Sequence, residues 1–210
     1  MDFKFKNRNI RTLVTSYKCW YIFSIQVLFL ELYNTIYRGD FVFAKKELER
    51  LDKIVSEVKR DMDLVGIPYS KVKVVLDSKL KKTLGSCHYD DDLNPILIKI
   101  SYRLFNNAPT QAIKNVICHE LIHSGVGHKF NHDGDWKIYS EKMNNAENYY
   151  KIQAHDNEYI KYTAMYEIIC SSCGNMTYRF RKNKEVKNPE FYVCCKCNHN
   201  MGDATITKIN

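Results

Sequence analysis

Two stretches of the chain place apolar residues at the spacing of an amphipathic helix. The first stretch covers residues 43–62, and Pro68 interrupts its pattern. The second covers residues 110–124 and is followed by Gly125 and Gly127, which favour the end of a helix. We therefore predict two helices, each with one face turned toward a core.

Short β-type runs lie between these helices. Residues 71–76 and 96–100 are rich in valine, isoleucine and leucine, which is typical of strands, and a further strand is predicted over residues 84–88. The three aspartates of residues 90–92 predict a solvated turn between the arms of a hairpin, and a second turn is predicted over residues 106–109. The chain thus contains a small sheet with an antiparallel part.

A third helix, which Asp133 or Asp135 can cap and which has Trp136 on its inner face, is predicted after the loop that follows Gly127. Residues 144–165 are polar and rich in tyrosine, and we interpret them as a connector. The order of elements is helix, small sheet, helix, helix and cysteine-rich segment, which predicts an α+β fold. We assign residues 41–165 to the main domain with its connector and residues 166–210 to a small second module.

Composition adds information about partners. The 210 residues hold 45% hydrophobic and 27% charged residues, as is ordinary for a globular protein with one core and a small satellite module. The net charge is +8. An excess of lysine and arginine favours polyanionic partners, with nucleic acid first and acidic membrane surfaces second.

The first 40 residues differ from the rest of the chain. Residues 1–18 are basic, and an apolar run over residues 19–30 follows, interrupted by Gln26. This run is shorter than the roughly 20 apolar residues of a membrane span. We rank a docked amphipathic helix or dispensable extension first, a membrane anchor through residues 19–37 second and a secretion signal third. The role of residues 1–40 stays open.

The strongest chemical signal is the motif His119-Glu120-Leu121-Ile122-His123. On a helix, positions i and i+4 share one face, so His119 and His123 can direct a ring nitrogen at one metal ion. Histidine nitrogen is a common zinc ligand, and Glu120 beside it would serve as a general base. The motif predicts two ligands and the base of a zinc-dependent peptide hydrolase. The alternative is a pair of histidines stacked near a core.

A catalytic zinc ion needs a third protein ligand. His128 and His132 are candidates, and the glycines between them and the motif would let the chain turn back. Glu141 and Glu147 are further candidates, because a glutamate is the third zinc ligand in gluzincin-type peptidases. The helix that carries Trp136 could hold His132 at its start, and the preference for His132 over His128 comes largely from the family resemblance given below.

Eight cysteines are present, and five of them crowd into residues 170–197. Paired spacing of this kind indicates a metal site in a reducing compartment, and we predict a cytoplasmic protein. Two CxxC pairs supply four thiolates for a closed, structural zinc site, and Cys195 is spare. The alternative is a redox-active dithiol pair. The four predicted ligands are Cys170, Cys173, Cys194 and Cys197.

Basic and aromatic residues alternate between the two cysteine pairs. Such a mixture suits single-stranded nucleic acid, because charges contact the backbone and rings stack on bases. The alternative is that the rings fill the small core of the module and the charges face water. The predicted nucleic-acid contacts are Arg179, Arg181, Lys182 and Lys184, with Tyr178, Phe180, Phe191 and Tyr192 as neighbouring rings.

The HELIH core, its apolar lead-in over residues 113–118, and His132 followed four residues later by Trp136 resemble the SprT-like (Spartan-type) metalloprotease family. The segment over residues 84–87 also resembles the one before the family's substrate-flanking strand. The resemblance implies a compact zincin-type peptidase with His132 as the third ligand, followed by a zinc ribbon as in bacterial members. In eukaryotic members the activity is the cleavage of proteins crosslinked to DNA.

We therefore expect a zinc-dependent endopeptidase with one catalytic and one structural zinc ion. Its expected substrates are proteins associated with or crosslinked to DNA, and single-stranded DNA is the expected partner. A nucleic-acid-binding zinc-ribbon protein, whose HExxH site holds zinc without catalysis, is the main alternative. A peptidase that acts on a membrane or envelope substrate is a third hypothesis, which depends on residues 1–40 being an anchor.

Overall fold

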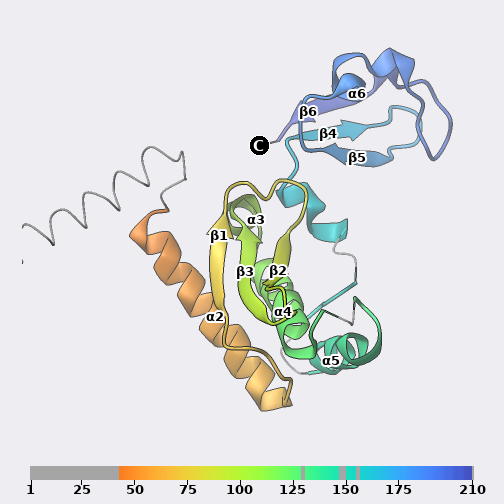
Figure 1. The fold of residues 1–210 in the computed structure, drawn as a ribbon. Helices are drawn as coiled ribbons and strands as arrows, with labels where there is room; N and C mark the ends of the chain where they lie inside the picture. The colour runs from red at the N-terminus through yellow and green to blue at the C-terminus, as the bar shows by residue number, and fades with distance from the viewer. Residues whose placement is uncertain (1–42, 129–130, 147–149, 155–156, 210) are drawn as a thin grey trace, which may run out of the picture. The chain divides into compact units, whose positions relative to one another are not determined.

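The computed structural model describes residues 43–128, 131–146, 150–154 and 157–209 (Figure 1). The predictions for residues 1–40, including membrane contact through residues 19–37, lie outside these described residues. Within the described part, no helix is both long enough and apolar enough to cross a membrane.

The first helix, α2 (Lys45–Val65), forms where the apolar periodicity predicts it. Its buried face includes Leu51, Ile54 and Val58, which follow one another at helical spacing. Gly66 comes directly after the helix with a φ of 69°, a left-handed conformation that glycine adopts at low cost at a helix end. One face of α2 therefore belongs to the core.

A three-stranded sheet follows, with the order β1-β3-β2. The strands are β1 (Lys73–Asp77), β2 (Gly85–Tyr89) and β3 (Pro95–Ser101). The strands β2 and β3 form the predicted antiparallel hairpin, whereas β1 pairs with β3 in parallel. In the turn, the carboxylate of Asp90 accepts hydrogen bonds from the backbone N–H groups of Asp92 and Asn94. The strand β2 lies at the edge of the sheet.

Three helices complete the main domain: α3 (Tyr102–Asn107), α4 (Thr110–Val126) and α5 (Gly134–Asn144). The helix α4 packs against β2, β3 and α5, so it is buried on several sides. It ends at Val126, and the next residue, Gly127, has a φ of 83°. The helix α3 was not predicted, because six residues are too few to show a helical period. It buries Leu104 and Phe105 in the core.

The structure describes the predicted connector, residues 144–165, except for residues 147–149 and 155–156. This connector contains the 3₁₀ helix η1 (Asn157–Tyr162). Side chains of α3 hold this part of the chain: Arg103 donates to the carbonyl oxygen of Thr163 and Asn107 to that of Tyr162. Tyr162 and Thr163 are therefore held against α3.

The C-terminal module has its own antiparallel sheet, with the order β5-β4-β6. Its small buried core consists of Ile168, Cys170, Val186, Cys194 and Met201. Short helical turns connect the strands around this core. Its elements are β4 (Tyr166–Ile169), β5 (Met176–Arg179), α6 (Lys184–Lys187), η2 (Pro189–Phe191), η3 (Met201–Asp203) and β6 (Thr205–Lys208).

Candidate active site

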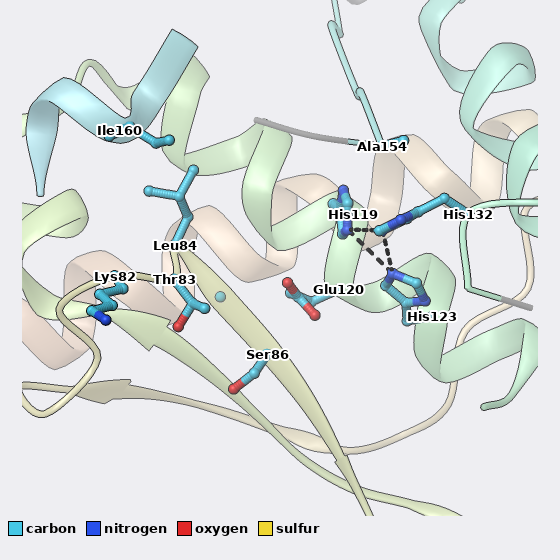
Figure 2. Close-up of a pocket in the computed structure, with 11 residues that line it drawn as sticks. Lys82, Thr83, Leu84, Ser86, His119, Glu120, His123, His132, Ala154 and Ile160 are labelled. Atoms are coloured by element: carbon cyan, nitrogen blue, oxygen red, sulfur yellow. Dashed lines mark hydrogen bonds between the residues drawn. The ribbon is translucent and has the colours of Figure 1, made fainter. Parts of the chain in front are cut away.

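Three histidines bring their Nε2 atoms together at one point of the main domain (Figure 2). The Nε2 atoms of His119 and His123 are 3.2 Å apart, those of His123 and His132 are 3.2 Å apart, and those of His132 and His119 are 3.1 Å apart. His119 and His123 come from consecutive turns of α4, and His132 precedes α5. The structure thus gathers the three histidines that the sequence analysis favoured.

This arrangement fits a zinc ion. Zinc–nitrogen bonds of about 2.0–2.1 Å in tetrahedral geometry separate two ligand atoms by about 3.3 Å, close to the distances observed here. Burial, together with the neighbouring His132 and His128, lowers the pKa of His123 to about 4. Its imidazole is therefore neutral at neutral pH, which is the form that binds a metal.

A backbone carbonyl orients the first of these ligands. The Nδ1 atom of His119 lies 3.1 Å from the carbonyl oxygen of Gln153. A proton on Nδ1 can be donated to this carbonyl, which leaves the lone pair of Nε2 for the metal. The amide of Asn144 holds the same segment, since it accepts from the N–H of Ile152 at 2.6 Å and donates to the carbonyl oxygen of Ile152 at 2.8 Å.

Trp136 forms the wall behind the three histidines. Its ring centroid lies 4.8 Å from that of His119, 5.5 Å from that of His123 and 4.6 Å from that of His132. The side chain is almost fully buried and comes from the first turn of α5. The ring therefore packs against all three imidazoles at once and restricts their orientation.

The front of the histidine cluster faces a cavity of about 390 Å³. Residues 82–86, which lead into β2, line one side of the cavity, and the apolar side chains of Ala154 and Ile160 line the other. Figure 2 shows the Glu120 carboxylate between β2 and the histidines, and the Glu120 side chain is buried. A metal ion at the cluster and a carboxylate would therefore both face one cleft.

The other described candidates for the third ligand are not members of the histidine cluster. His128 is exposed, and its ring stands edge-on to Tyr89 at a centroid distance of 5.2 Å. Glu141 is exposed on α5, and Glu147 lies outside the described residues. Among the described residues, the metal-type cluster of the main domain consists of His119, His123 and His132.

The four predicted cysteine ligands also come together. The Sγ atoms of Cys170 and Cys197 are 3.7 Å apart, as are those of Cys173 and Cys194. Tetrahedral zinc with bonds of about 2.3 Å separates its sulfur atoms by about 3.8 Å, so the cluster fits zinc. Backbone N–H groups of Lys196 and Cys197 lower the pKa of Cys194 to about 6, which favours the thiolate. Cys195 is exposed and lies outside the cluster.

The predicted nucleic-acid contacts have different environments. Arg179 is half-buried and binds both carboxylate oxygens of Glu185 through its guanidinium group. Arg181, Lys182 and Lys184 are exposed. Phe191, one of the neighbouring rings, is also exposed, so it does not fill the core of the module.

The fold and the histidine cluster define a metalloprotease of the HExxH type. The model of the SprT-like family matches residues 47–156, more than half of the chain, and the chain belongs to this family. Searches of curated proteins and of solved structures found no match.

Proposed function

We propose that this metalloprotease is a zinc-dependent endopeptidase whose substrates are proteins bound or crosslinked to DNA. The observation that carries the catalytic part is the convergence of three Nε2 atoms, 3.1–3.2 Å apart, beside the Glu120 carboxylate in an open cleft. Three protein ligands leave one coordination position for water, as catalytic zinc sites do. This supports an enzyme over a binding protein with a non-catalytic HExxH site.

His119, His123 and His132 would hold the catalytic zinc ion. When bound, zinc supplies Lewis acidity, which activates water and polarises the scissile carbonyl. The chain's own contribution to proton transfer comes from Glu120. Its carboxylate accepts the proton of the attacking water and then returns it to the nitrogen of the leaving amine. The low exposure of Glu120 favours this role, because few bulk water molecules compete for the carboxylate.

The second zinc ion would be held by Cys170, Cys173, Cys194 and Cys197 in the C-terminal ribbon. The exposed Arg181, Lys182 and Lys184, together with the exposed ring of Phe191, support a contact with single-stranded DNA. Arg179 is a weaker candidate, because Glu185 already binds its guanidinium group. The paired spacing of the ribbon cysteines favours a reducing compartment and thus a cytoplasmic protein.

The proposal is tested by cleavage of a DNA-binding protein with and without single-stranded DNA. We expect the zinc-loaded chain to cleave it faster when DNA is present. Glu120→Gln keeps the shape of the side chain but removes the base, so kcat should fall by about 10²–10⁴-fold with both zinc ions retained. Cleavage that is unchanged by Glu120→Gln would refute the enzymatic mechanism.

A pair of charge variants tests the DNA part separately. Arg181→Ala with Lys182→Ala should reduce the stimulation by DNA and its salt dependence, but leave DNA-free cleavage unchanged. The matched control is Lys46→Ala with Lys53→Ala, which removes the same charge from exposed positions of α2. An equal loss in both pairs would show that only net charge matters, and no loss in the first pair would exclude the ribbon as the contact.

A further inference from the structure

Gly85, the first residue of β2, lies against the side chain of Glu120. A Cβ atom added at Gly85 would lie 2.8 Å from Cγ and 2.9 Å from Oε1 of Glu120. Non-bonded carbon atoms are most favourably separated by about 3.5–4.0 Å. Any side chain at position 85 would therefore occupy the space that Glu120 now fills.

The backbone does not require glycine at this position. Positive φ angles occur at Gly66, Gly127, Gly134 and Gly174, and Gly85 is not among these described glycines. Gly85 is paired in register with Ile100 of β3, as an ordinary strand residue is. Glycine in a strand costs stability relative to alanine, because it loses more conformational freedom on folding. The space needed by Glu120 is thus the reason for glycine that the structure offers.

Glu120 has little room to move away. The residue is only 7% exposed, so the protein surrounds its side chain. The added Cβ at position 85 could not move toward α4 either, because it would already meet Cγ1 of Val116 at 3.1 Å. A methyl group at position 85 would have to rotate the Glu120 carboxylate out of its present position beside the histidines. Misplacement of a reacting group by about 1 Å can reduce a rate by about 100-fold.

We propose that Gly85 is a positioning residue, whose missing side chain lets β2 and α4 hold the Glu120 carboxylate in the cleft. Its catalytic consequence rests on the proposed role of Glu120 as the base. Its structural content is independent of that role, because it concerns only the space between Gly85 and Glu120.

The structural content is tested by a double-mutant cycle on the zinc-loaded full chain. Gly85→Ala should lower the melting temperature of the main domain by about 3 °C or more in the parent. In a Glu120→Ala background the two contacts with Glu120 are absent and only the 3.1 Å contact with Cγ1 of Val116 is left, so the same change should cost much less or nothing, since alanine also reduces the entropy of the unfolded chain. Trp136 fluorescence, in a Trp20→Phe background, would follow the main domain alone. An equal loss in both backgrounds would overturn the proposal.

Gly125 provides the matched glycine control. A Cβ atom there would lie 2.1 Å from the backbone carbonyl oxygen of Pro68, so the obstacle is main chain and not Glu120. Gly125→Ala should therefore destabilise the main domain equally with Glu120 present or replaced. This control shows whether the Gly85 effect is specific to its partner.

The catalytic consequence is tested with the same DNA-binding protein as the substrate. Gly85→Ala should retain zinc in both sites, lower kcat by about 100-fold and leave KM nearly unchanged. A raised KM with unchanged kcat would overturn the proposal, because Gly85 would then serve to admit the substrate. If the parent chain cleaves nothing, the proposed function fails, while the melting-temperature cycle still decides whether Gly85 positions Glu120.

Discussion

The two metal-type clusters of this chain differ in ligand number and in what surrounds them. In the main domain, three imidazoles converge in front of the buried ring of Trp136 and face a cavity of about 390 Å³. In the C-terminal module, four sulfur atoms surround one point, and the Cys170 and Cys194 side chains are buried. Three ligands leave a position for reacting water, whereas four close the shell. Ligand number thus separates a site built for chemistry from one built for stability.

The clusters also differ in how much each fold depends on them. The main domain buries a large apolar core, which includes Ile98, Ile113 and Leu121 at full burial. The C-terminal module has five buried core residues, and two of them, Cys170 and Cys194, are predicted ligands. A core this small rarely folds without a metal or disulfides. The main domain should therefore survive the loss of its ion, while the module should not.

The largest expected effect is on the fold of the C-terminal module when metal is removed. Structural zinc contributes about 10–16 kcal/mol in small zinc modules, which exceeds the stability of most small domains. A strong chelator should therefore unfold residues 166–210 and leave the main domain folded. Hydrogen exchange resolved by segment would measure this. Protection from exchange that persists in β4 and β5 after complete loss of zinc would show that the C-terminal module does not need the metal ion to fold.

A smaller effect is expected from removing one ligand of the catalytic site. His132→Ala should lower the zinc affinity of the main domain by more than about 100-fold, because even groups that only orient a ligand contribute about 10–100-fold. The ribbon should keep its own zinc, so one of two equivalents would be lost. Zinc titration of the full chain measures both sites.

His128→Ala is the matched control for His132→Ala. His128 is exposed and lies outside the cluster of Nε2 atoms, so its removal should leave two zinc equivalents bound with unchanged affinity. The opposite result, loss of zinc in His128→Ala but not in His132→Ala, would show that the wrong histidine has been assigned as the ligand.

The parts of the site that could be predicted are those in which the spacing of nearby residues indicates both the local secondary structure and the metal ligands. The spacing of His119 and His123 indicates a helix and a shared face at the same time, and the two CxxC pairs define a ligand set by themselves. Spacing alone left His128 and His132 as alternatives. The choice between them depends on how α5 packs, which is a property of the whole fold.

Other features could not be predicted, because no side-chain pattern encodes them. The parallel pairing of β1 with β3 depends on contacts between distant segments. The group that orients His119 is the backbone carbonyl of Gln153, which every residue type possesses. Gly85 contributes by lacking a side chain, and the sequence does not show that Glu120 lies beside it.

The smallest of these effects should come from Asn144, which contacts neither the metal nor the substrate. Its amide makes two hydrogen bonds with the backbone of Ile152, next to the carbonyl of Gln153 that faces His119. Asn144→Ala should let this segment move, weaken the orientation of the His119 ring and lower zinc affinity in the main domain by about 10-fold. The neighbouring Asn145 is exposed, so Asn145→Ala is the matched control. Competition with a chelating dye would measure the zinc affinity of both variants. Equal affinities would mean that the segment held by Asn144 does not affect zinc binding at the catalytic site.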